Sequence, residues 1–182
     1  MRVVNIVDAG VFRGIGKPPN EDFDSLREIV TGVRDGEIQL PRPIYAELGG
    51  NPDAEPHPSG SEYVDTGIRD GWISIADPIE DTSPVVDAKR DARHVMEAQV
   101  AHPGTAVFEA DLSLVGLVVQ LFERAETIHV NLFTTDDPLR KAGVAVVQYY
   151  GYHDFDVYFA PPQTVTDALL QSSHFDAGYR VE

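Results

Sequence analysis

The chain has 182 residues and 42% of them are hydrophobic, which is enough for one domain with a well-formed core. It carries 30 acidic and 14 basic residues, a net charge of −16, and no cysteine. The lack of cysteine excludes disulfides, thiolate metal sites and thiol nucleophiles. The sequence contains neither an apolar run long enough to span a membrane nor an N-terminal signal segment, so we expect no membrane contact and a cytoplasmic location.

The acidic balance favours one of two interpretations. A strongly negative surface repels phosphate at ordinary ionic strength, which argues against nucleic acid as a partner. The same surface is typical of a protein from a very salty cytoplasm, where such repulsion is screened within about 3 Å at 1 M salt. Arginine outnumbers lysine and the acids are spread along the whole chain, so we favour the salt-adapted interpretation. Net charge then says little about the ligand.

The first stretch of the chain predicts a buried strand that ends on an acid. Four of residues 3–7 are apolar and β-branched, a composition typical of a strand buried on both faces. Asp8 follows directly, and open α/β sheets usually keep their chemistry at the carboxyl ends of their strands. The alternative is that Asp8 only caps a turn before Gly10.

The rest of the chain alternates between predicted helices and strands. Residues 11–19 are rich in glycine and predict a loop, and apolar residues spaced i, i+3, i+4, i+7 predict a helix that ends near Gly36. Further predicted elements are strands over 37–40, 72–76, 128–135 and 156–159, and helices over 44–48, 61–69, 85–101, from Asp111, 138–150 and 164–171.

This alternation predicts an α/β fold with three layers, α/β/α, around a central and mostly parallel sheet. We expect a domain over residues 1–160. Residues 161–182 are expected to form a C-terminal extension that consists of a helix and a loose tail.

Three more acids occupy positions that meet one edge of such a sheet. Asp136 ends a strand, Asp111 begins a helix and Glu47 lies in the short helix after two prolines. Strand carboxyl ends and helix amino ends share one edge of a parallel sheet, so these acids would repel each other unless a cation neutralises them. All-oxygen ligation suits Mg²⁺ or Mn²⁺, which can activate water and stabilise the leaving oxygen of a phosphodiester.

Each of these acids also has a structural interpretation. Asp111 can act as the N-cap of an apolar helix, and either Asp136 or Asp137 can cap the helix that Pro138 begins. Glu47 can be a solvated helix residue. Because the chain holds 30 acids, some of them reach strand ends by chance.

Four segments carry an acid in a comparable local setting. In chain order they are residues 7–12 (VDAGVF), 40–48 (LPRPIYAEL), 109–117 (EADLSLVGL) and 133–143 (FTTDDPLRKAG). Together they resemble the acidic motifs of the PIN-domain family, in the order of that family, over roughly residues 1–160. The resemblance implies a PIN-like fold and a metal-dependent ribonuclease that hydrolyses RNA phosphodiesters.

The resemblance also implies roles for individual residues. One acid from each motif is implied to be catalytic and to bind Mg²⁺ or Mn²⁺: Asp8, Glu47, Asp111 and Asp136. Thr134 is implied to steady the site by a hydrogen bond, and in an alternative register Asp137 replaces Asp136 as the metal ligand. The family acts in RNA maturation or decay or as the toxin of a toxin–antitoxin pair, so RNA, an antitoxin or other regulatory protein and a second copy of the chain are implied partners.

Basic residues near the predicted edge are candidates for contact with RNA phosphates. They are Arg13, Lys17, Arg140 and Lys141. The alternative is ordinary solvated charge, which is also our interpretation of three bases in the 85–101 helix, with acids of the same helix as partners: Lys89, Arg90 and Arg93 with Asp87, Asp91 and Glu97. The six histidines show no ligand spacing, so no zinc site is expected.

Two other function classes fit the same residues. A PIN-like module could bind RNA or a protein partner without catalysis, which the acidic surface and the length of the chain favour. A phosphoryl-transfer enzyme also places an aspartate at a strand end, but the first strand is not followed by an Asp-x-Asp motif, so it ranks last.

Overall fold

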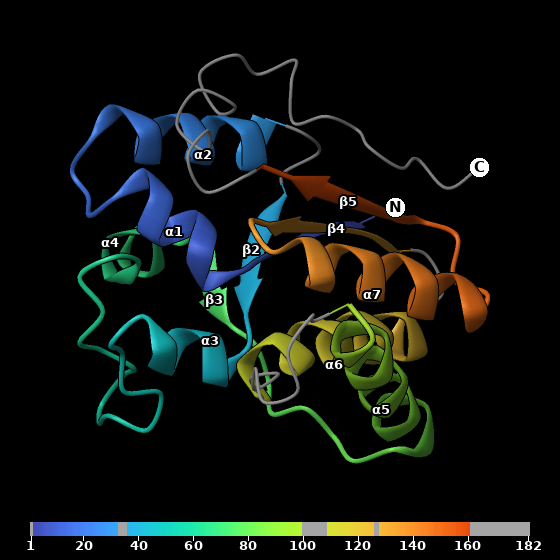
Figure 1. The fold of residues 1–182 in the computed structure, drawn as a ribbon. Helices are drawn as coiled ribbons and strands as arrows, with labels where there is room; N and C mark the ends of the chain where they lie inside the picture. The colour runs from blue at the N-terminus through green and yellow to red at the C-terminus, as the bar shows by residue number, and fades with distance from the viewer. Residues whose placement is uncertain (1, 33–35, 100–108, 126–127, 161–182) are drawn as a thin grey trace.

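A five-stranded sheet forms the centre of the computed structural model, which describes residues 2–32, 36–99, 109–125 and 128–160 (Figure 1). Its strands, in chain order, are β1 (Arg2–Val7), β2 (Glu37–Leu40), β3 (Ile73–Ile75), β4 (Ile128–Thr134) and β5 (Phe155–Phe159). In space their order is β3-β2-β1-β4-β5, and every neighbouring pair is parallel. The predicted α/β class is confirmed, with an entirely parallel sheet among the described residues where a mostly parallel one was predicted.

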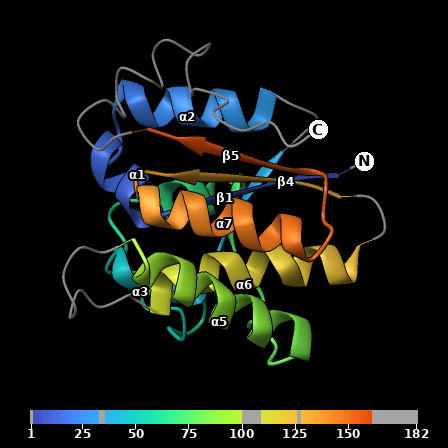
Figure 2. The ribbon, with the colours of Figure 1, turned by 45° about the vertical axis from the view of Figure 1, so that its right-hand side comes forward.

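Helices cover both faces of this sheet. They are α1 (Ala9–Ile15), α2 (Glu21–Gly32), α3 (Arg42–Glu47), α4 (Asp65–Arg69), α5 (Ser83–Glu97), α6 (Glu109–Arg124) and α7 (Asp137–Tyr149). α2 lies on one face, while α6 and α7 lie on the other with α5 outside them (Figure 2). This arrangement confirms the three predicted layers.

The apolar sequence of β1 explains its central place in the sheet. Its residues Val4, Ile6 and Val7 are fully buried, because β2 and β4 pair with its two edges and helices cover both faces. α6 is buried on nearly all sides between Leu112 and Val119, because it lies between the sheet, α5 and α7. This burial fixes where the first turn of α6 meets the carboxyl edge of the sheet.

The structure corrects the loop predicted over residues 11–19, because α1 occupies its first part. Glycine lowers helix propensity, but Asp8 caps this helix, and Val11, Phe12 and Ile15 bury one face of it in the core. Tertiary packing therefore overrides local propensity here. α6 begins at Glu109, so Asp111 lies in its first turn and is not its N-cap as the alternative interpretation supposed.

The ion pairs of α5 also differ in part from the prediction. Arg90 pairs with acids of its own helix, at 2.7 Å from Asp87. Lys89 and Arg93, however, both pair with Glu109 at the start of α6. These two contacts hold the first turn of α6 against α5, which a rule based on helix spacing alone does not reveal.

Other predicted elements shift by a few residues at their ends. The predicted helix over 164–171 and the extension over 161–182 lie outside the described residues. Within the described ranges, each helix is too short or too polar to cross a membrane.

Candidate active site

Asp8 lies at the carboxyl end of β1 and is 5% exposed. One of its carboxylate oxygens accepts the N–H of Gly10 and so caps α1. The other accepts the hydroxyl of Thr134 and, at 2.9 Å, the N–H of Thr135. Burial raises the pKa of the Asp8 carboxyl, and these hydrogen bonds act in the opposite direction. The strand-end and capping interpretations of Asp8 are thus both realised in one geometry.

Thr134 connects Asp8 to the second strand-end acid. Its fully buried hydroxyl donates to Asp8 and accepts the N–H of Asp136 at 2.9 Å. The Asp136 carboxylate in turn accepts the N–H of Leu139 at 2.7 Å and is the N-cap of α7. β1 and β4 are neighbours in the sheet, so this one hydroxyl fixes the acids that follow them relative to each other.

Asp111 brings the remaining acids into the same region. It is partly buried in the first turn of α6, and its pKa is raised to about 7. Burial is the largest cause, followed by the negative charges of Asp136, Asp8 and Glu47. Charges shift a pKa in this way only at short range. Four chain segments therefore deliver one carboxylate each to the carboxyl edge of the sheet.

Asp137 has different surroundings from Asp136. Its carboxylate pairs with Lys141 at 2.7 Å and with Arg140, whose Nε lies at 2.8 Å. The hydrogen bond from Lys141 is the main reason why the pKa of Asp137 is lowered. Asp137 is not among the charges that raise the pKa of Asp111.

The chemistry of the four acids fits a hard divalent cation, although Asp8, Glu47 and Asp136 are engaged in hydrogen bonds within the protein. Carboxylate oxygens are the ligands that Mg²⁺ and Mn²⁺ prefer. Within the described part of the chain, no three histidine or acidic side chains converge closely enough to hold a metal ion. Charges interact over several ångströms whereas ligands must approach to about 2.0–2.6 Å, so the two findings agree. Cation binding would require Asp8, Asp136 or Glu47 to give up protein contacts.

The four bases predicted to contact RNA all pair with acids of the chain. Arg13 contacts Glu47 at 2.7 Å, and Lys17 pairs with Glu62. The other two bases, Arg140 and Lys141, both form ion pairs with Asp137. Arg140 also lies over the ring of Phe159, 5.3 Å from its centre. An RNA phosphate would have to compete with these acids.

Two residues that the sequence-based reasoning did not single out support this site. The Thr135 N–H donates to Asp8, and a Cβ atom on Gly10 would collide with the Thr135 side chain and lie 2.8 Å from the Asp8 carboxylate. Gly10 is therefore required by close approach. The sequence feature that could have indicated this role for Gly10 is its position two residues after an acid at a strand end.

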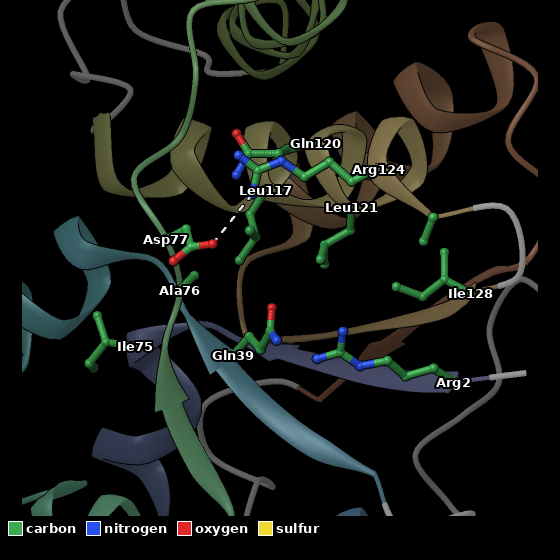
Figure 3. Close-up of a pocket in the computed structure, with 11 residues that line it drawn as sticks. Arg2, Gln39, Ile75, Ala76, Asp77, Leu117, Gln120, Leu121, Arg124 and Ile128 are labelled. Carbon is green, nitrogen blue, oxygen red and sulfur yellow. Dashed lines mark ion pairs between the residues drawn. The ribbon is translucent and has the colours of Figure 1, made fainter.

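A separate cavity of about 300 Å³ lies between α6 and the strands β1 to β3 (Figure 3). None of the four acids lines it. Its two arginines already pair with acids, Arg124 with Asp77 at 3.5 Å and Arg2 with Glu37 outside the cavity. The negative charges that raise the pKa of Asp111 come from Asp136, Asp8 and Glu47, so they converge outside this cavity.

We expect Thr134→Val to lower the free energy of unfolding by about 2–3 kcal/mol, because it removes a buried donor to a carboxylate and an acceptor for the Asp136 N–H. Chemical denaturation at high salt measures this change. Thr31→Val is the matched control, since among the described residues that hydroxyl bonds to the carbonyl of Arg27 within its own helix and to no other group. Equal losses in the two variants would contradict a special role for Thr134.

The parallel α/β sheet with acids at its carboxyl edge defines a protein of the PIN-like fold class. A family model described as the halobacterial PIN domain matches residues 1–172, and the chain belongs to this family. PIN domains are commonly metal-dependent nucleases. The halobacterial family also supports the salt-adapted interpretation of the acidic composition. Searches of curated proteins and of solved structures find no match to this chain.

Proposed function

We propose that this chain is a metal-dependent endoribonuclease that hydrolyses RNA phosphodiesters at the carboxyl edge of its sheet. The observation that carries the proposal is the convergence of acids from four separate chain segments at one edge of the sheet, where three of them add to the burial that raises the pKa of Asp111. Such a concentration of negative charge costs stability unless a cation neutralises it. Membership of the PIN family supports the same chemistry.

In this proposal four carboxylates would hold one or two Mg²⁺ or Mn²⁺ ions: Asp8, Glu47, Asp111 and Asp136. Asp136 is preferred to Asp137 because its charge acts on Asp111, whereas Asp137 is paired with two bases of α7. A bound divalent cation supplies activation of water and neutralisation of charge on the leaving oxygen.

The residues of the chain have separate tasks in this proposal. Thr134 orients the Asp8 carboxylate through its hydroxyl, and Asp8 is buried where bulk water is largely excluded. Because its pKa is raised to about 7, the Asp111 carboxyl carries a proton in about half of the metal-free molecules at neutral pH. That proton must leave when a cation binds, so cation binding is coupled to proton release from Asp111.

The test is cleavage of labelled single-stranded RNA by the purified protein at about 1 M salt, where surface repulsion is screened. We expect fragments to appear with Mn²⁺ or Mg²⁺, to cease with a chelator and to return when the ion is restored. Cleavage that persists in the chelator would contradict a metal-dependent mechanism.

A module that binds RNA or a protein without catalysis is the second candidate function. The contact between Arg13 and Glu47 favours it, because this acid is already engaged by a base of the chain. Calorimetry with Mn²⁺ separates the two candidates. A non-catalytic module should release no heat that depends on Glu47 or Asp111.

Three expectations from the sequence stay predictions. They are an antitoxin partner, a homodimer, and the division of the chain into residues 1–160 and 161–182.

A further inference from the structure

Arg13 donates hydrogen bonds to both the side chain and the main chain of Glu47. Its Nη1 lies 2.7 Å from the Glu47 Oε1, and its Nη2 donates to the Glu47 carbonyl oxygen at 3.0 Å. Glu47 is the last residue of α3, where carbonyl groups lack partners within the helix. The guanidinium of Arg13 therefore caps α3 and fixes the direction of its terminal carboxylate.

Two other acids of the site, Asp8 and Asp136, are held by neutral groups. Asp8 accepts two N–H groups and a hydroxyl, and Asp136 accepts the N–H of Leu139. Among the contacts of the described residues, Arg13 is the one cation bonded to any of the four acids. Arg13 places a single positive charge at the Glu47 carboxylate, where a divalent cation would place a double positive charge.

We infer that Arg13 is an internal counter-ion that competes with the divalent cation for the Glu47 carboxylate. This inference rests on the proposed function. In the metal-free protein Arg13 holds Glu47, and cation binding requires the Glu47 carboxylate to exchange the guanidinium for the ion. Arg13 is thus a positioning residue that weakens cation binding, so the site fills only at higher ion concentrations.

The exposure of the pair makes this exchange energetically accessible. The side chains of Arg13 and Glu47 are 48% and 35% exposed, and ion pairs with such exposure are weak. Water can solvate the guanidinium as it leaves. High salt screens charges separated by more than about 3 Å at 1 M, but two groups in direct contact still interact. The competition should therefore persist in a salty cytoplasm.

The test is calorimetric titration with Mn²⁺ at about 1 M salt, for the wild type, Arg13→Gln, Glu47→Gln and the double variant. We expect Arg13→Gln to bind Mn²⁺ about fivefold more tightly, because the ion no longer displaces a bound guanidinium. Glu47→Gln should bind more weakly. When Glu47→Gln is already present, adding Arg13→Gln should leave the affinity for Mn²⁺ unchanged.

Two further variants control for charge and for folding. Arg27→Gln removes one exposed positive charge from α2, and its affinity should equal that of the wild type. Arg13→Lys keeps the charge but can no longer bind the side chain and the carbonyl as a fork, so its affinity should lie between those of the wild type and Arg13→Gln. Thermal unfolding of each variant verifies that it is folded during the titration.

The outcomes that overturn the inference are distinct from those that overturn the function. If the wild type binds Mn²⁺ and Arg13→Gln binds it no more tightly, the competition does not exist. If Arg13→Gln raises the affinity for Mn²⁺ equally in the wild type and in Glu47→Gln, the gain is a general effect of charge. That result would also overturn the inference. If the wild type itself takes up no Mn²⁺, the metal-dependent nuclease and this inference fail together.

Discussion

Asp8→Asn is expected to lower the rate of RNA cleavage in Mn²⁺ by about 10²–10³-fold, the loss typical when one preorganised electrostatic group is removed from an active site. The substitution keeps the size of a buried side chain and removes its negative charge. It also leaves a hydrogen-bond donor where the carboxylate accepts from Gly10, Thr134 and Thr135. The rate should be measured with saturating ion at about 1 M salt.

A loss of activity counts only if the variant is folded. Because one of three buried donors loses its acceptor, Asp8→Asn should lower the free energy of unfolding by about 1–3 kcal/mol. Assays should therefore stay well below the midpoint of thermal unfolding. Asp24→Asn, in the exposed first turn of α2, is the matched control and should cleave at the wild-type rate. Equal rates for Asp8→Asn and the wild type would remove Asp8 from the mechanism.

Asp111→Asn is expected to stabilise the metal-free protein above neutral pH. The Asp111 pKa rises from 3.8 in the unfolded chain to about 7 in the folded protein. Between these values the folded state binds more protons, so stability falls as pH rises from about 4 to about 7. A shift of this size corresponds to about 4 kcal/mol, which solvent and salt around a partly exposed carboxyl reduce to about 1–2 kcal/mol.

The pH profile of unfolding distinguishes this effect from an improvement in packing. At about pH 4 Asp111 is protonated in the folded protein, so the variant and the wild type should be equally stable. At about pH 8 the variant should be more stable. Saturating Mn²⁺ should reverse that order, because an ion at 100 times its Kd stabilises the wild type by about 2.7 kcal/mol. A gain that is the same at every pH would contradict a charge effect.

The sequence predicted much of the fold because hydrophobic patterns and chain breakers are local. Four of the six residues of β1 are apolar and β-branched, and Pro138 marks the start of α7, so both elements could be placed to within a residue or two. Strand-end acids could be placed for the same reason. In a parallel sheet, a strand that ends in aspartate has only one edge at which to present it.

Contacts between distant segments could not be predicted in this way. Arg13 was a candidate for contact with RNA phosphate or for ordinary solvated charge. Neither interpretation identified its partner Glu47, which lies 34 residues further along the chain and is brought to it by α3. α1 was missed because the glycines of its sequence favour a loop, whereas its stability comes from burial against elements formed much later in the chain. Periodicity carries information about one element, not about what packs against it.

The hydrogen bond between Thr134 and Asp8 joins residues that are 126 positions apart. During synthesis β1 leaves the ribosome long before β4. The first strand therefore cannot pair with β4 until most of the chain has been translated. Such long-range closure slows folding. It also means that a nascent chain shorter than 134 residues cannot assemble this carboxylate arrangement.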